Sequence, residues 1–230
     1  MTANFFHKVI SKLIDKEFKR QEYSNQAMFN SKKSFYPCIT VSRESGSGGR
    51  LIAALVAKKL KIKFYDKQFV NLISKSSKKR KEVVLSLDER SKGVVEGIID
   101  SLTSSKNKLS ASHYFKHLCQ IILSLSEKNS AVILGRGSNF IIPPRRALNV
   151  RIIAPFKVRV ANAIKYEKKS LNQAKKHIDH TYNERKDFVK RYFLKDISNA
   201  NYYDLVINTE FTSLEQAVDI IAKAFKDRFA

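Results

Sequence analysis

Short apolar runs bounded by turn residues recur along the chain and predict a parallel sheet. Five runs have the pattern of buried strands, over residues 37–42, 61–65, 130–134, 149–154 and 204–208. Helical spacing of apolar positions fills much of the sequence between them, over residues 51–60, 67–75, 156–166, 170–193 and 213–228. Strands that alternate with helices favour an α/β fold, in which a doubly wound parallel five-stranded sheet is covered on both faces.

The stretch between the second and third predicted strands is helical in pattern but interrupted. Several helical patterns lie within residues 82–127, and polar turns are predicted near 90–93 and 104–112. The basic run 76–81 predicts a solvated loop, because a series of serines, lysines and arginine offers no apolar face to bury.

Residues 1–36 have the pattern of a basic amphipathic extension, and the main domain is expected over residues 37–230. Apolar side chains recur in the extension at helical spacing, with lysines on much of the other face, at Phe6, Val9, Ile10, Leu13 and Ile14. Such a helix either docks on its own domain or lies on an anionic membrane, and docking is the favoured interpretation. Interrupting lysines and an aspartate argue against a signal peptide.

Charge is the unusual feature of the composition. The 230 residues include 44 lysines and arginines against 21 aspartates and glutamates, which gives a net charge of +23 and a pI of about 10.0. This charge favours anionic partners, which include nucleotides, nucleic acid and acidic lipid, but does not choose among them. A general enrichment of lysine on solvated surfaces explains it equally well.

The cysteines and the hydropathy pattern indicate a cytoplasmic protein. Cys38 and Cys119 stand far apart, with no Cys-x-x-Cys or Cys/His cluster, so two buried and reduced thiols are expected. No stretch reaches the about 18–20 uncharged apolar residues that a membrane-spanning helix needs.

Glycine is scarce, yet it is concentrated in two turns that follow predicted strands. Only seven glycines occur, and five of them are Gly46, Gly48, Gly49, Gly135 and Gly137. We therefore expect both turns to need backbone geometry that other residues avoid. The first turn connects a strand to a helix, where glycine lets backbone N–H groups converge on a phosphate at the helix N-terminus. Phosphate binding is favoured over a tight turn without a ligand.

The first turn departs from the regular phosphate-binding motif G-x-x-x-x-G-K-[ST]. With the second motif glycine at Gly48, Arg43 stands at the first glycine, Gly49 at the lysine and Arg50 at the hydroxyl position. Leu51 follows and supplies no hydroxyl either. A guanidinium suits phosphate well, so Arg50 is expected to supply the missing charge.

Other polar residues are expected near this turn, because ligands gather at the carboxyl ends of parallel strands. Asp66 follows the second predicted strand and Arg136 follows the third. Arg185 interrupts the apolar stripe of the helix predicted over 170–193 and therefore needs an anionic partner. That partner is either a carboxylate or the phosphate of a ligand.

Five stretches, taken in order, resemble the cytidylate kinase-like family, P-loop relatives of the nucleoside monophosphate kinases. They lie at residues 39–50, 64–66, 132–137, 152–155 and 203–209. The resemblance implies a P-loop kinase-like fold with a helical, nucleoside monophosphate-binding insertion at about 67–128 and a lid at about 166–191. It also implies phosphoryl transfer from ATP with Mg²⁺ to a nucleotide or similar small anionic acceptor.

The resemblance further implies roles for individual residues. The donor phosphates would be held by the first turn, which comprises Ser45, Gly46, Ser47, Gly48, Gly49 and Arg50. Asp66 and Arg136 would face the acceptor. Arg185 and Arg191 would reach the transferring phosphoryl group and act in catalysis together with Arg50. No metal ligand is identified.

Several positions depart from true cytidylate kinases. Their first turn resembles G-x-x-G-x-G-K-G-T, whereas Gly49 and Leu51 stand here at its lysine and threonine. Lys67 and Leu72 stand where those enzymes have a serine and an arginine, and Gly137 stands where they have an aspartate. These differences argue against CMP as the acceptor.

Three hypotheses on function follow. The favoured one is a kinase that transfers phosphoryl groups from ATP to a nucleoside monophosphate or similar small acceptor. The second is a nucleotide-binding sensor or interaction protein without turnover, which the missing lysine and hydroxyl motivate. The third is an RNA-associated protein that uses the net charge, and it is not favoured because the basic residues are scattered and no module with stacking aromatics is apparent.

Overall fold

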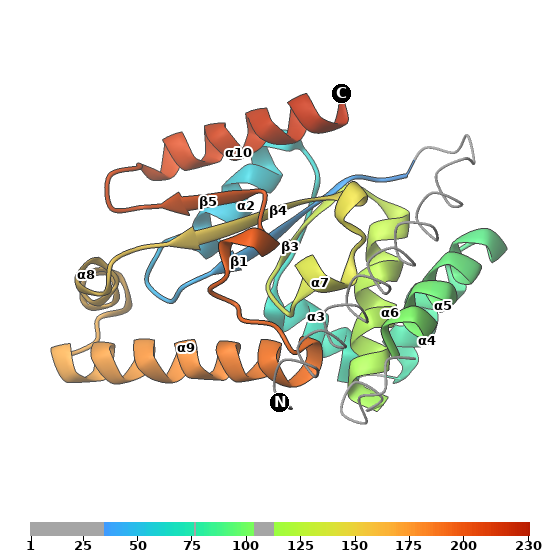
Figure 1. Cartoon of the computed structure of the whole chain (residues 1–230), viewed down its shortest axis with the longest axis horizontal. Coiled ribbons are helices and arrows are strands. Elements are labelled where there is room, and N and C mark those ends of the chain that lie inside the picture. The colour runs from blue at the N-terminus through green and yellow to red at the C-terminus, as the bar shows by residue number, and fades with distance from the viewer. Residues whose placement is uncertain (1–34, 76, 104–112) are drawn as a thin grey trace, which may run out of the picture. The chain divides into compact units, whose positions relative to one another are not determined.

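A computed structural model of the chain describes residues 35–75, 77–103 and 113–230 (Figure 1). Tyr36–Ala230 form one compact unit. The predictions for the N-terminal extension, up to residue 34, and for the turn at 104–112 lie outside the described residues.

The core of this unit is a five-stranded parallel sheet in the order β2-β3-β1-β4-β5, and all five predicted strands are confirmed. The strands are β1 (Cys38–Arg43), β2 (Lys63–Tyr65), β3 (Ala131–Leu134), β4 (Ala147–Ile153) and β5 (Leu205–Asn208). β1 lies at the centre, and its residues Cys38 to Val41 pair with β3 while the whole strand pairs with β4. The turns after β1 and β3 therefore leave the sheet side by side.

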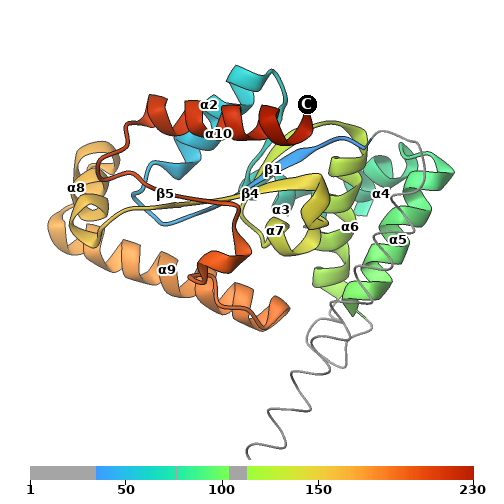
Figure 2. The same ribbon diagram turned by 45° about the horizontal axis from the view of Figure 1, so that its top comes forward.

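Helices cover both faces of the sheet, as the alternating pattern predicts. α2 (Gly49–Leu60) and α10 (Leu214–Phe229) pack on one face, against Ile39 and Val41 of β1 (Figure 2). The opposite face buries Cys38 together with residues of α6 (His113–Lys128). Alternate residues of β1 thus belong to two separate hydrophobic cores, which is the pattern of a doubly wound sheet.

The insertion between β2 and β3 is entirely helical where it is described. It contains α3 (Lys67–Lys75), α4 (Ser77–Leu85), α5 (Glu89–Thr103) and α6. The loop predicted at 76–81 is wrong from Ser77 onward, since lysine and arginine are good helix formers and Val83 packs on the core. The turn predicted at 90–93 is also wrong. The break comes earlier, where Asp88 Oδ1 accepts a hydrogen bond from the Ser91 N–H at 2.7 Å.

Two helices form a hairpin after β4. α8 (Phe156–Glu167) and α9 (Leu171–Phe193) pack together, and Ser170 caps α9 through a reciprocal hydrogen-bond pair with Gln173. Most of the segment predicted as a lid, 166–191, is thus the helix α9 (Figure 1). None of the described helices combines the length and the apolarity that crossing a membrane requires.

Short elements complete the unit and set the edges of the site. They are α7 (Ser138–Ile141) after β3, and two 3₁₀ turns, η1 (Pro144–Arg146) and η2 (Ala200–Tyr202). The two cysteines are buried free thiols, as predicted. Burial raises the pKa of Cys38 to about 11 and that of Cys119 to about 12, so neither is a nucleophile at neutral pH.

Candidate phosphate-binding site

The glycines of the first turn adopt the left-handed backbone that the sequence predicts for them. Gly46 has a φ of +81° and Gly48 a φ of +76°, and Gly48 is the N-cap of α2. A Cβ atom at Gly46 would lie 2.5 Å from the carbonyl oxygen of Arg159. The first backbone N–H groups of α2 have no acceptor within the helix, so together with the helix dipole they are suited to bind an anion.

Hydrogen bonds from two other segments and one within the turn hold it in place. Asn162 Nδ2 donates to the Gly46 carbonyl at 2.8 Å, and Thr209 Oγ1 donates to the Ser47 carbonyl at 3.0 Å. The Ser47 hydroxyl is buried and donates to the Glu44 carbonyl at 2.9 Å. Ser47 therefore presents its backbone, and not its side chain, to a ligand.

The second turn, after β3, is more strained. Gly135, Arg136 and Gly137 all have positive φ, of 80°, 58° and 65°. For arginine this conformation is costly, and such strain is concentrated at functional sites. The Arg136 guanidinium lies 5.2 Å from the centre of the Phe188 ring, and its buried Nε has no hydrogen-bond partner.

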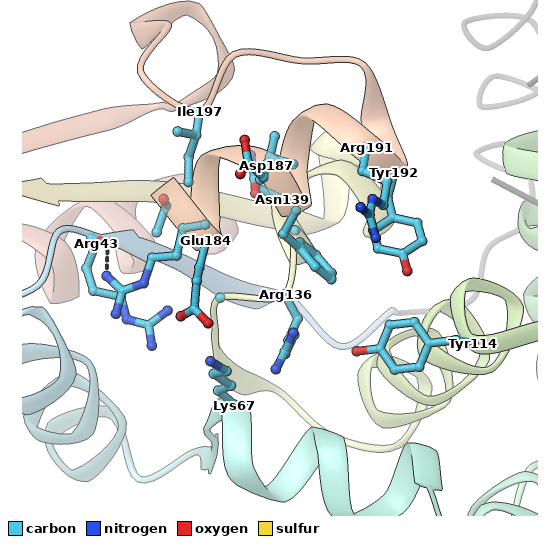
Figure 3. Close-up of a pocket in the computed structure, with 16 residues that line it drawn as sticks. Arg43, Lys67, Tyr114, Arg136, Asn139, Glu184, Asp187, Arg191, Tyr192 and Ile197 are labelled. Carbon is cyan, nitrogen blue, oxygen red and sulfur yellow. Dashed lines mark hydrogen bonds between the residues drawn. The ribbon is translucent and has the colours of Figure 1, made fainter. Parts of the chain in front are cut away.

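A pocket of about 400 Å³ opens between the end of β1, the second turn, α9 and the helical insertion (Figure 3). Five cationic side chains line it, from Arg43, Lys67, Arg136, Arg185 and Arg191. Its other lining side chains include two carboxylates, two tyrosines and an amide, from Glu184, Asp187, Tyr114, Tyr192 and Asn139. The pocket lies at the carboxyl ends of β1 and β3, which is where the sheet topology predicts a ligand.

The cations of the pocket repel one another. Burial and then the charges of Arg185, Arg136 and Arg50 lower the pKa of Arg43 to about 9, and only Asp66 acts in the opposite direction. Burial also lowers the pKa of Arg185 to about 10, although the carboxylate of Glu184 partly compensates. A site with this excess of buried positive charge is stabilised by an anion.

Lys67 and Asn139 add polar groups to the lining of the pocket. Burial and the nearby Arg136 lower the pKa of Lys67, while Glu184 raises it, and Figure 3 shows the amine of Lys67 and the carboxylate of Glu184 directed toward one another. Asn139 Nδ2 is buried and has no hydrogen-bond partner. Unpartnered buried donors are rare in folded proteins, so Asn139 and the Nε of Arg136 are available for a ligand.

Of the predicted site residues, three line the pocket, whereas residues 45–49, Arg50 and Asp66 do not. Arg136, Arg185 and Arg191 line the pocket. Arg50 and Asp66 do not line it, and instead form an ion pair of 2.8 Å in which the Arg50 side chain is 66% exposed. Asp66 also accepts a hydrogen bond from the first turn of α3, at Phe69 N.

The partner of Arg185 differs from both alternatives that the sequence leaves open. Its Nη1 donates to the backbone carbonyl of Arg43 at 2.6 Å, shown dashed in Figure 3. Neither a carboxylate nor a ligand phosphate is needed to hold this side chain in place. The bond ties α9 to the end of β1, so the pocket face of α9 is anchored to the start of the first turn.

Sequence reasoning missed Arg43, Lys67, Tyr114 and Asn139 as site residues. Arg43 had a signal, since it stands where the regular motif has its first glycine. Lys67 had one as well, because it directly follows the strand-end residue Asp66. Tyr114 and Asn139 carry no sequence signal of this kind, because their approach to the pocket depends on how the insertion and α7 pack.

The loop does not fit a magnesium ion held by protein ligands. Leu51 supplies no hydroxyl, the Ser47 hydroxyl is committed to Glu44, and Gly137 supplies no carboxylate. The Glu44 carboxylate accepts from Ala154 N and lies 3.4 Å from Arg159 Nε. Among the residues that the structure describes, no three His, Cys, Asp or Glu side chains form a metal-binding group.

Comparison with known proteins agrees with this geometry. The cytidylate kinase-like family matches residues 38–211. A curated cytidylate kinase from Methanosphaera stadtmanae is 31% identical over 110 residues, and the match covers 44% of this chain and 63% of that protein, which is less than two thirds of its length.

A solved structure shows the same fold. An uncharacterized protein from Eubacterium ventriosum superposes with a TM-score of 0.58 at 19% identity, covering 83% of this chain and 98% of the other. A shikimate kinase from Bacteroides thetaiotaomicron reaches a TM-score of 0.45 at 12% identity over 83% of this chain and 98% of its own, too low a score to bear on function. Since the family match spans most of the chain, including both turns and α9, this chain belongs to the cytidylate kinase-like family.

Proposed function

We propose that this protein transfers a phosphoryl group from ATP to a nucleoside monophosphate or a similar small phosphate-bearing acceptor. The observation that carries the proposal is the cationic pocket, which opens beside the glycine turn at the carboxyl end of β1. Membership of the cytidylate kinase-like family supports it, as does the likeness to a protein named cytidylate kinase.

The donor phosphates are assigned to the glycine turn. Residues 45–50 present backbone N–H groups at the start of α2, where the helix dipole favours an anion. The turn is braced by Asn162 and Thr209, so it needs little rearrangement to hold a phosphate. Magnesium would arrive on the phosphates of ATP, because the turn offers it no ligand of its own.

The acceptor is assigned to the pocket. Its volume of about 400 Å³ lies within the range of small-molecule sites. Arg136, Arg185 and Arg191 are suited to its phosphate, since guanidinium groups bind phosphate oxygens in pairs. The rings of Tyr114 and Tyr192 provide apolar faces for the rest of the acceptor. The lysine at position 67 and the glycine at position 137 argue against CMP.

The chemistry follows from the charges. An oxygen of the acceptor phosphate forms a new P–O bond to the γ-phosphorus of ATP, while the bond to the β-phosphate oxygen breaks and its electron pair leaves with ADP. The attacking oxygen is already anionic at neutral pH, so no general base is required. The protein contributes position and positive charge, which are the main sources of catalysis in phosphoryl transfer.

The test is ADP release from ATP in the presence of each nucleoside monophosphate in turn. We expect release with one acceptor class, and a loss of at least tenfold in kcat/KM for Arg136→Gln. Lys175→Gln is the matched control, because it removes the same charge from an exposed position on α9. ATP binding without release for any acceptor would instead support the nucleotide sensor. Absence of ATP binding at millimolar concentration would refute the donor assignment and make RNA the next ligand to test.

A further inference from the structure

The first turn lacks a cationic residue at the position where the regular phosphate-binding motif has its lysine. In the regular motif a lysine follows the last loop glycine, and the next hydroxyl binds Mg²⁺. Here the corresponding residues are Gly49 and Arg50, followed by Leu51. Arg50 reaches away from the pocket to Asp66. The charge that the motif places after its last glycine is therefore absent from that place.

Steric packing links this absence to Arg43. A Cβ atom at position 49 would lie 2.6 Å from the Cβ of Arg43 and 3.1 Å from its Cγ. A side chain at position 43 and a lysine at position 49 therefore exclude one another. The two departures from the motif, arginine for the first glycine and glycine for the lysine, therefore belong together. The cation stands at the start of the turn, at Arg43, and not directly after the last loop glycine.

The guanidinium of Arg43 is fixed between the donor turn and the acceptor pocket. It packs against Gly135, where its Nη1 occupies the space that a Cβ atom would take, and the φ of +80° at this position favours glycine. Its pKa is lowered by the charges of Arg185, Arg136 and Arg50 and raised by that of Asp66, so these charged groups lie near it.

The donors of this guanidinium are free for a ligand. Within residues 35–75, 77–103 and 113–230, no hydrogen bond or ion pair joins the Arg43 guanidinium to another side chain or to the backbone. A partly buried guanidinium whose N–H donors bind no described group, with Arg136 and Arg185 nearby, is stabilised when an anion binds.

We propose that Arg43 is a phosphate-binding residue which takes over the charge of the missing lysine and of the missing metal-binding hydroxyl. The site would therefore bind the pyrophosphate moiety of a nucleoside di- or triphosphate without a divalent metal. This inference relies on the proposed function only for the identity of the nucleotide, because inorganic pyrophosphate carries the same chemistry.

Calorimetry with inorganic pyrophosphate tests the proposal on the full chain. We expect saturable binding in EDTA, with a dissociation constant within about threefold of that in magnesium. Arg43→Gln, which keeps the Cβ, Cγ and Cδ atoms but removes the guanidinium charge, should weaken binding in EDTA by about 10–100-fold, since charge-assisted hydrogen bonds are lost. Lys157→Gln, an exposed change of the same charge, should leave binding unaltered.

The outcomes separate this inference from the proposed function. Pyrophosphate binding by the wild type that requires magnesium would overturn the inference, and this measurement needs no variant to fold. Equal binding by Arg43→Gln and the wild type would overturn it too. Binding in EDTA that depends on Arg43, with no phosphoryl transfer to any acceptor, would uphold the inference while the proposed function fails.

Discussion

The exclusion between positions 43 and 49 predicts a coupling that a double-mutant cycle measures directly. Gly49→Ala adds a single methyl group at the first position of α2, where the backbone is helical and alanine is otherwise acceptable. The new carbon would lie 2.6 Å from Arg43 Cβ, about 1 Å closer than the contact distance of about 3.5–4.0 Å. Neither partner can move easily, because Arg43 is held against Gly135 and position 49 by the helix.

Overpacking of this kind costs about 1–3 kcal/mol, so Gly49→Ala should lower the free energy of unfolding by about 2 kcal/mol. In the Arg43→Gly background the two shortest contacts vanish, and the nearest remaining atom is Ile152 Cβ at 3.3 Å. Alanine there should cost nothing, or gain up to about 1 kcal/mol, since glycine is the poorer helix former. The cycle should therefore give a coupling energy of about 2 kcal/mol between the two positions.

The assay is urea unfolding followed by far-ultraviolet circular dichroism, because the chain has no tryptophan. The four proteins are the wild type, the two single variants and the double variant. Equal destabilisation by Gly49→Ala in both backgrounds would show that Arg43 does not fill the space at position 49. The reasoning that links Gly49 to Arg43 would then be refuted.

Three further changes separate the roles of single residues. Arg43→Gln should raise the Tm of the ligand-free protein at pH 7. The pKa of Arg43 is lowered to about 9, so the cost of burying its charge is fully present below pH 9 and is relieved as the pH rises above it; the gain in Tm should accordingly be smaller at pH 10 than at pH 7. Arg136→Gly should leave the urea midpoint of unfolding unchanged or higher, because it removes a left-handed arginine backbone that costs about 1–2 kcal/mol. The same variant should raise the KM for the acceptor more than tenfold in steady-state kinetics. Asp66→Asn should change the free energy of unfolding by less than about 1 kcal/mol, because its ion-pair partner Arg50 is exposed. It should also leave the KM for the acceptor unchanged. A KM that rises as it does for Arg136→Gly would instead place Asp66 in the acceptor site.

The fold was largely predictable because its signals are local. Each strand is a short apolar run between turn residues, and the positive φ of Gly46, Gly48, Gly135 and Gly137 follows from where scarce glycines stand. The errors arose where tertiary packing overrode local polarity. The segment from Ser77 onward is polar, yet it is helical since Val83 packs on the core.

The site was less predictable, because its key contacts join distant parts of the chain. Arg136 was predicted near the site because it follows a strand, and Arg185 because it interrupts an apolar stripe; both line the pocket. Arg43 was read only as a departure from a motif, and its meaning depends on Gly135, which lies 92 positions away in the sequence. Arg50 was assigned to the donor phosphates by position along the loop, whereas its side chain turns to Asp66.

The most direct test of the central claim is the stoichiometry of the products. The protein is incubated with ATP and the acceptor that supports ADP release, and all nucleotides are separated and quantified. The account predicts one ADP for each phosphorylated acceptor formed, with both products reduced at least tenfold by Arg136→Gln and unchanged by Lys175→Gln. ADP that accumulates with inorganic phosphate and without a phosphorylated acceptor would contradict it, because the pocket would then admit water and not an acceptor.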